Sequence, residues 1–174
     1  MKIGLTLLIA LMFILIPISA QEISECTVIN SPGNYYLAND LYGSPDAPCI
    51  IINASNVVLD CRHHTIYGPG GSFGIITINE TSAPGYRTGI QIHNCQLENF
   101  YRAISVHGIV TIRNVTIDAK NVEGSMGIVL TYGDIAGILN VSVINADVGI
   151  GIYSSGSVVT VSYTHLTLPT NREV

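Results

Sequence analysis

The stretch VTIRNVTIDA, residues 110–119, decides the fold. Its first four residues alternate apolar and polar side chains, which is the period-two pattern of a short strand with one buried face. Asn114 interrupts the alternation, and asparagine tolerates the left-handed backbone region that a tight bend requires. The alternation then resumes at Val115. The stretch therefore predicts two short strands that meet at a bend on Asn114.

The same pattern recurs along the chain. Asn94 in IQIHNCQLEN and Asn140 in GILNVSVINA stand where Asn114 stands, at steps of 20 and 26 residues. VVLDCRHHTI, residues 57–66, fits the same frame earlier. Because one unit cannot bury its apolar face alone, the units must stack as a parallel coil, and we expect Asn94, Asn114 and Asn140 to align as a ladder of amide side chains. A sandwich of antiparallel hairpins is the alternative fold.

Two segments carry a resemblance to a known family. CTVINSPGNYYLANDL, residues 26–41, and CIIINASNVVLDCRHHTIYG, residues 49–68, resemble the N-terminal segment of right-handed parallel β-helix proteins of the pectin-lyase-like class, in particular NosD-type, carbohydrate-associated repeat proteins. Cys61 and His63 replace two glycines of the family pattern, and His64 matches its histidine. The resemblance covers nearly all of residues 26–159. It implies an all-β, right-handed parallel β-helix of about five coils, truncated at its C-terminus, with no single activity because the family is functionally mixed.

The two ends differ from this repeat. Residues 1–20 predict a signal peptide, because Lys2 is followed by an apolar run and by the small residues Ser19 and Ala20. We expect cleavage after Ala20. If the segment stayed uncleaved, it would tether the protein to the membrane. Residues 161–174 follow one reading frame of a transposase-type sequencing adapter, so we interpret them as a library artefact. Between the ends we expect an N-terminal capping segment over residues 21–55 and β-helix repeats over residues 56–160.

Charge excludes some classes of partner. Residues 21–159 carry eleven acidic and five basic side chains, a net charge of −6. Nucleic acid is therefore excluded as a partner, since phosphate binding needs a basic face, and so is electrostatic docking on anionic lipid.

Four cysteines lie in this region: Cys26, Cys49, Cys61 and Cys95. An even count in an exported chain permits disulfides, with three full pairings. We favour Cys26 with Cys49, and then Cys61 with Cys95, and four buried thiols remain the alternative. Their spacing matches no C-x-x-C zinc or redox motif.

No catalytic, cofactor or metal residue is assigned from the sequence. His63 and His64 are adjacent, so on a strand they point to opposite faces and cannot both bind one metal without distortion. The family's hydrolases carry an Asp-Asp pair, a Gly-His-Gly and an Arg-x-Lys, which this sequence lacks. A lyase would need clustered acids for calcium and a base, for which Arg102 and Arg113 are the candidates. The scattered acids are interpreted as solvated turn residues: Glu98, Asp118, Asp134 and Asp147.

Several polar residues suit a carbohydrate context. The N-x-[ST] sequons place possible N-glycans at Asn53, Asn79, Asn114 and Asn140, with Asn79 the best acceptor, because a ladder asparagine cannot also carry a glycan. The tyrosines suit sugar stacking, or half-buried strands: Tyr35, Tyr36, Tyr42, Tyr67, Tyr86 and Tyr101. GPGGSFG, residues 68–74, predicts a protruding loop and not a phosphate cradle, since no helix is expected after it.

These observations favour a secreted, cell-surface or periplasmic repeat protein with a non-catalytic role toward polysaccharide or cell-surface glycan. The alternatives are a polysaccharide lyase or glycoside hydrolase whose catalytic residues lie partly outside this fragment, and a periplasmic accessory protein for metal delivery.

Overall fold

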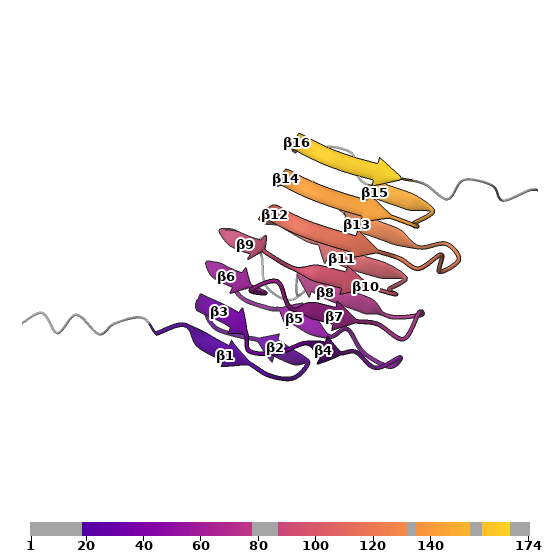
Figure 1. Ribbon diagram of the computed structural model, residues 1–174. Coiled ribbons are helices and arrows are strands. Elements are labelled where there is room, and N and C mark those ends of the chain that lie inside the picture. The colour runs from indigo at the N-terminus through magenta and orange to yellow at the C-terminus, as the bar shows by residue number, and fades with distance from the viewer. Residues whose placement is uncertain (1–18, 78–86, 132–134, 154–157, 168–174) are drawn as a thin grey trace, which may run out of the picture.

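The computed structural model describes residues 19–77, 87–131, 135–153 and 158–167, and everything below concerns these residues. They form sixteen strands and no helix. Every pairing between strands is parallel, so the sandwich alternative is wrong. The strands stack as a β-solenoid of about five turns (Figure 1). No helix among these residues is long and apolar enough to cross a membrane.

Each turn of the coil has three sides. The first side holds β1 (Gln21–Ile23), β3 (Gly33–Leu37), β6 (Val57–Asp60), β9 (Ile90–His93) and the first halves of β12 (Ile109–Asp118), β14 (Ile135–Ile144) and β16 (Val158–Thr167). The second side holds β4 (Leu41–Tyr42), β7 (Thr65–Tyr67), β10 (Gln96–Glu98) and the second halves of β12, β14 and β16. The third side holds β2 (Thr27–Ile29), β5 (Ile50–Ile52), β8 (Phe73–Thr77), β11 (Arg102–Val106), β13 (Met126–Leu130) and β15 (Val148–Ile152).

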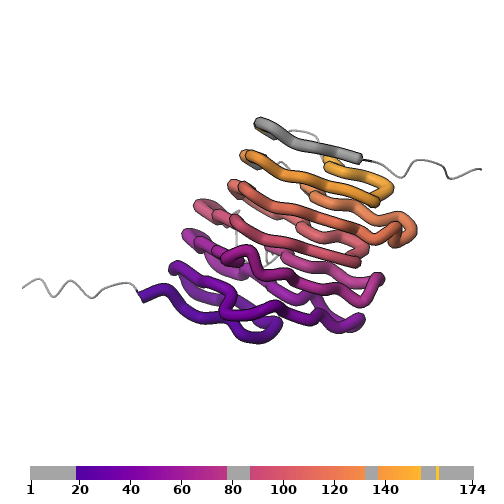
Figure 2. The backbone as a smooth tube through the Cα atoms, viewed as in Figure 1, coloured from indigo at the N-terminus to yellow at the C-terminus, as the bar shows by residue number. Residues whose placement is uncertain are grey.

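The coil is right-handed. In Figure 1 the strands of the first side, among them β12 and β14, lie in front and run to the right while the chain rises from coil to coil. Figure 2 shows the same stack as a tube, in which each coil lies directly on the one before it. β16 pairs with β14 over residues that the adapter interpretation covers.

The core is a set of aligned columns, one for each side. Strand alternation turns every second side chain inward, and parallel register places it on the equivalent residue of the next coil. The inward columns are fully buried or nearly so: Leu59, Ile92, Ile112 and Ile138 on the first side, Ile66, Leu97, Ile117 and Val143 on the second, and Ile50, Ile75, Ile104 and Ile128 on the third. Each such side chain contributes about 1.5–3 kcal/mol through burial, so the columns supply most of the stabilisation.

The corner between the first and second sides is built on asparagine. Asn94, Asn114 and Asn140 adopt φ values of 56°, 53° and 50°. Nδ2 of Asn114 donates to Oδ1 of Asn94 at 3.2 Å, and Nδ2 of Asn140 donates to Oδ1 of Asn114 at 3.0 Å. His63, with a φ of 66°, occupies the same corner one coil earlier, since Thr65 pairs with Gln96. The bend at Asn114 lies inside one continuous strand, β12, so the two strands expected from its sequence are joined.

Two disulfides link successive coils. Cys26 pairs with Cys49 and Cys61 with Cys95, at sequence separations of 23 and 34, as the favoured pairings predicted. The first ties the residue before β2 to the residue before β5, and the second ties the corner after β6 to the residue before β10. Four buried free thiols are thereby excluded.

Candidate binding groove

A groove of about 320 Å³ lies on the outer face of the third side. Ile76 of β8 and Ser105 of β11 lie at its floor and are register partners. They face outward because their neighbours Ile75 and Ile104 face the core. The groove runs across the strands from one coil to the next, so residues from different coils line it.

One wall of the groove is the segment Pro45–Pro48, which connects the second side to β5. Several contacts hold this segment: a bridge pairs Ser44 with Ala47, and the backbone N–H of Gly43 donates to the carbonyl of Tyr67 at 2.7 Å. The Cys26–Cys49 disulfide fixes the end of the segment against β2. The wall is therefore anchored at both ends.

Arg102 lies at one end of the groove between two aromatic rings. Its guanidinium carbon is 5.6 Å from the centre of the Phe73 ring and 5.5 Å from that of Tyr101, and the two rings meet edge to face at 6.4 Å. Such cation–π contacts hold the guanidinium in place. No carboxylate among the described residues pairs with it.

Two buried donors in this groove lack a hydrogen-bond partner among the described residues. They are Nε of Arg102 and Oγ of Ser72, and the Ser72 side chain is 3% exposed. A buried polar atom without a partner costs about 1–3 kcal/mol, so such atoms are rare in stable proteins. Both residues line the same groove, but these two atoms are covered by neighbouring atoms, so a group in the groove meets the rest of the half-buried Arg102 guanidinium.

His107 lies in the groove with its position fixed by hydroxyls. Its backbone N–H donates to Oγ1 of Thr77 at 2.6 Å, and its Nδ1 is 3.0 Å from Oγ1 of Thr131 on the next coil. Asp46, on the wall, is the one carboxylate among the described lining residues. The groove thus combines a cation, an imidazole, hydroxyls and an apolar floor.

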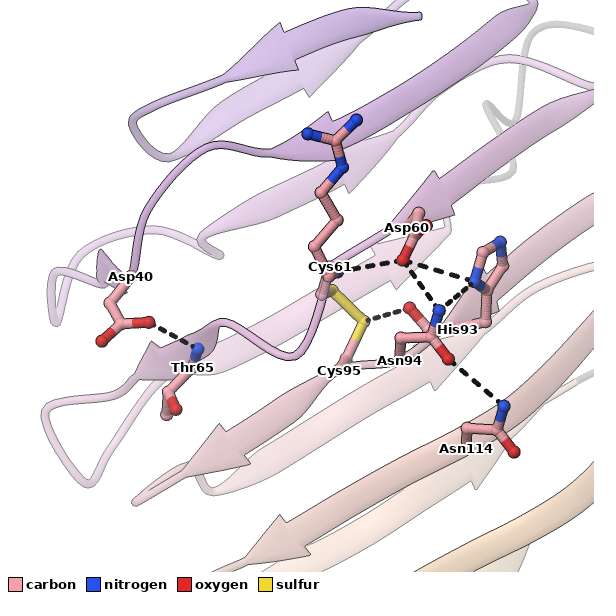
Figure 3. Close-up of a disulfide and its surroundings, with 9 residues drawn as sticks. Asp40, Asp60, Cys61, Thr65, His93, Asn94, Cys95 and Asn114 are labelled. Carbon is pink, nitrogen blue, oxygen red and sulfur yellow. Dashed lines mark hydrogen bonds and ion pairs between the residues drawn. A yellow bond between two sulfur atoms is a disulfide. The ribbon is translucent and has the colours of Figure 1, made fainter.

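The corner around the Cys61–Cys95 disulfide is a second cluster of polar groups, but its members bond to one another (Figure 3). Oδ1 of Asp60 accepts from the backbone N–H of Arg62 at 2.9 Å and from Nδ2 of Asn94 at 3.0 Å, and it lies 3.5 Å from Nδ1 of His93. Burial raises the pKa of Asp60, but these hydrogen bonds and the nearby charges lower it more, so the pKa lies below its ordinary range. This cluster is a structural corner.

The two adjacent histidines have separate surroundings. Nδ1 of His64 is 3.2 Å from Oδ1 of Asp40, whose pKa is lowered chiefly by a hydrogen bond from the backbone N–H of Thr65. His63 is exposed at the corner. The described residues contain no group of three or more histidine, cysteine or acidic side chains that could hold a metal ion.

The acids singled out in the sequence have partners outside the groove. Asp118 bonds to Lys120 at 2.7 Å and accepts from Asn145, and Glu98 lies 3.2 Å from Lys120. Asp147 accepts from the backbone N–H of Gly124. Asp134 lies outside the described residues. Arg113, on the outer face of the first side, is exposed.

The sequon asparagines are placed as follows. Nδ2 of Asn53 donates to Oδ1 of Asn30 at 3.1 Å, and its Oδ1 accepts from Arg87 at 2.7 Å. Asn114 and Asn140 bond within the ladder. Asn79 lies outside the described residues, so the best glycan candidate stays a prediction.

The tyrosines do not gather at one site. Tyr42 and Tyr67 stack on the second side at 5.1 Å, Tyr36 lies 3.5 Å under the Arg62 guanidinium, and Tyr35 is buried. Tyr101 contacts Arg102 beside the groove. Tyr86 lies outside the described residues.

Sequence reasoning missed most of the groove. The loop predicted over residues 68–74 covers residues 68–72, because β8 begins at Phe73, and its last residue, Ser72, is buried beside the groove. Phe73 and Arg102 face each other because they are register partners on β8 and β11. The feature of the sequence that could have identified this contact is that both residues stand at the start of a strand of the third side.

No protein-family model, no curated protein and no solved structure matches the chain. The chain is a parallel β-solenoid of about five turns with two disulfides and, on its third side, a groove that carries two buried donors without partners.

Proposed function

We propose that this protein is an exported β-helix protein, related to the NosD-type, pectin-lyase-like proteins, that binds saccharide in the groove without transforming it. Two disulfides are typical of an oxidising compartment outside the cytoplasm, and residues 1–20 have the pattern of a signal peptide. We place the protein in the periplasm, at the cell surface or in the medium.

The observation that carries the proposal is the Arg102 guanidinium, which lines the groove beside the Phe73 ring and pairs with no carboxylate among the described residues. A sugar ring offers oxygen acceptors around its edge and apolar C–H groups on its faces. The acceptors match the Arg102 guanidinium, and the C–H groups match the aromatic ring and the Ile76 floor. A volume of 320 Å³ lies at the lower end of the range of about 300–1,000 Å³ found for ligand pockets.

The number of carboxylates that line the groove favours a binding role over hydrolysis. Glycoside hydrolysis uses two carboxyl groups about 5–10 Å apart, and the described lining residues supply Asp46 alone. Asp118 and Asp147 are held by partners elsewhere in the coil.

A glycan array followed by titration calorimetry tests the proposal. We expect binding to a saccharide, and we expect Arg102→Ala to weaken it about tenfold, which corresponds to about 1.4 kcal/mol. Arg113→Ala is the matched control, because Arg113 is exposed on another side of the coil, and it should leave the affinity unchanged.

Two outcomes contradict the proposal. One is the absence of binding to any saccharide on the array. The other is release of reducing ends or unsaturated uronates from a bound polysaccharide, which would make the protein a hydrolase or lyase.

A further inference from the structure

The two disulfides differ in their exposure to solvent. Cys26 is half-buried, and its Sγ lies 3.5 Å from the carbonyl oxygen of Tyr42 in a solvent-exposed contact. Cys61 and Cys95 are 0% and 1% exposed, and Sγ of Cys95 lies 3.3 Å from the carbonyl oxygen of His93 in a buried contact (Figure 3). A dissolved reagent therefore reaches the first disulfide in the folded protein, whereas it meets the second only after local opening of the coil.

The two sulfurs of the exposed disulfide are not equivalent. Cys26 lines a hollow of about 270 Å³ together with Tyr42 and Pro48. Its partner Cys49 is 1% exposed. The described residues that line the hollow include no carboxylate, so none of them repels an incoming thiolate. The sulfur open to attack is therefore that of Cys26.

The backbone around this disulfide is held independently of the bond between the sulfurs. The N–H of Thr27 donates to the carbonyl of Cys49 at 2.8 Å, and the N–H of Cys49 donates to the carbonyl of Phe73 at 3.1 Å. β2 and β5 are also paired in register from Thr27 and Ile50 onward. A reduced Cys49 can stay buried, since a free cysteine packs as a small apolar side chain. The first coils therefore remain folded when the two sulfurs separate.

We propose that Cys26–Cys49 is a thiol–disulfide exchange site for a small thiol compound, with Sγ of Cys26 as the sulfur that is attacked. Reduction there frees the wall segment Pro45–Pro48 from its covalent link to the residue before β2, while Cys61–Cys95 stays closed. This inference does not depend on saccharide binding.

The exchange proceeds in two steps. The thiolate of the reagent bonds to Sγ of Cys26, the bond between Cys26 and Cys49 breaks, and Sγ of Cys49 leaves with the electron pair and takes up a proton. A second thiolate then attacks the reagent's sulfur in this mixed disulfide, and Sγ of Cys26 leaves and takes up a proton. Two thiols of the reagent are oxidised to one disulfide, and the disulfide of the protein is reduced to two thiols.

Alkylation during graded reduction tests the site. The oxidised full chain is incubated without denaturant with glutathione or dithiothreitol, trapped at intervals with N-ethylmaleimide, and digested for mass spectrometry. We expect Cys26 and Cys49 to be exposed to labelling at least about tenfold faster than Cys61 and Cys95, because the buried pair must wait for local opening. The glutathione adduct should form on Cys26, and circular dichroism should keep its β-sheet signal while the first pair is reduced.

Two controls show that the difference comes from the fold. In concentrated urea the two pairs should be reduced at similar rates. The Cys61→Ala, Cys95→Ala variant should keep the fast reaction, and the Cys26→Ala, Cys49→Ala variant should lack it. The comparison of the two pairs within the unaltered protein decides the proposal if either variant does not fold.

Several outcomes contradict the proposal. Equal rates for the two pairs in the folded protein, earlier reduction of Cys61–Cys95, or no reduction of either pair without denaturant each overturn the exchange site. A glutathione adduct on Cys49 in place of Cys26 overturns the assignment of the attacked sulfur. Loss of the β-sheet signal in step with the first reduction overturns the folded dithiol form.

Discussion

Asn114 stabilises its corner in two ways, through its backbone and through its side chain. Its φ of 53° lies in the left-handed region, where asparagine is better tolerated than other residues with a side chain. Its amide also bonds to Asn94 below and Asn140 above. The two contributions can be separated by substitution.

Replacing Asn114 by alanine or by glycine distinguishes the two contributions. Both variants lose the ladder bonds, but only alanine suffers the left-handed backbone. We therefore expect Asn114→Ala to lower the free energy of unfolding by about 1–2 kcal/mol more than Asn114→Gly. Urea unfolding followed by circular dichroism measures both. Equal losses would mean that the corner backbone carries no such cost.

His93 makes stability depend on pH. Burial lowers the pKa of His93 below its ordinary value of 6.5, the Arg113 charge lowers it further, and the Asp60 carboxylate opposes both. A histidine that binds its proton less readily when folded contributes stability that is complete above that value and is lost as the pH falls below it.

We therefore expect the free energy of unfolding to fall between about pH 7 and pH 5, and to fall less steeply in His93→Gln. Asp60, whose pKa is lowered from 3.8, contributes outside this window, because its contribution is lost only at lower pH. Urea titrations at a series of pH values give the slope. The same slope in His93→Gln would assign the pH dependence to other groups.

At the scale of single residues, the sequence predicted the inward and corner side chains and not the groove. Alternation alone identifies inward residues such as Ile112, and an interrupted alternation identifies Asn114. No such rule identifies the residues of the groove, which face outward. Alternation shows which side chains face outward, but it does not show which outward column is covered by another segment and which column lines a groove. Ser72 and Arg102 become neighbours of one groove only through the register of β8 and β11.

The two disulfides belong to different elements and have different expected effects. Cys26–Cys49 anchors the wall segment Pro45–Pro48 of the groove, whereas Cys61–Cys95 clamps the corner between the first and second sides. Their loop lengths of 23 and 34 residues are similar, so the entropy that each removes from the unfolded chain is also similar.

We expect each cysteine pair, when replaced by alanines, to lower the free energy of unfolding by about 2–5 kcal/mol. The affinity for saccharide should respond differently. The Cys26→Ala, Cys49→Ala variant should bind about tenfold more weakly because its wall is loosened. The Cys61→Ala, Cys95→Ala variant should bind like the unaltered protein under conditions where both are folded.

Calorimetry at low temperature, together with urea unfolding of the same samples, checks this pair of variants. Equal affinity in both variants would show that the wall does not need its disulfide.

The contacts that stabilise the whole molecule lie between neighbouring coils. Each strand pairs only with strands of the neighbouring coils. Among the described strands, the end strands have one partner each: β1, β2, β4, β15 and β16. The strands between them have two, and β12, which spans two sides, has three. In such stacked architectures stability is close to a sum of local and neighbour interactions. Local opening should therefore begin at an end of the stack and proceed inward.

Hydrogen exchange measured by mass spectrometry tests this order. We expect the slowest exchange in β9, β11 and β12, and faster exchange in β1, β2 and β15, because opening an end coil breaks one interface and opening a middle coil breaks two. Uniform exchange across the stack would indicate a single cooperative unit instead.

The ladder asparagines are 20 residues apart in one coil and 26 in the next, yet their side chains still meet. Four of the six additional residues lie in the turn 119–125, which corresponds to 99–101 one coil earlier, and the other two lie between β13 and β14. Strand length and register are therefore unaffected. A gene encoding such a chain can gain or lose codons at these turns, or duplicate an entire coil, without disturbing the strands of the other coils. The length of the solenoid, and of its outer faces, can thus change in evolution by one coil at a time.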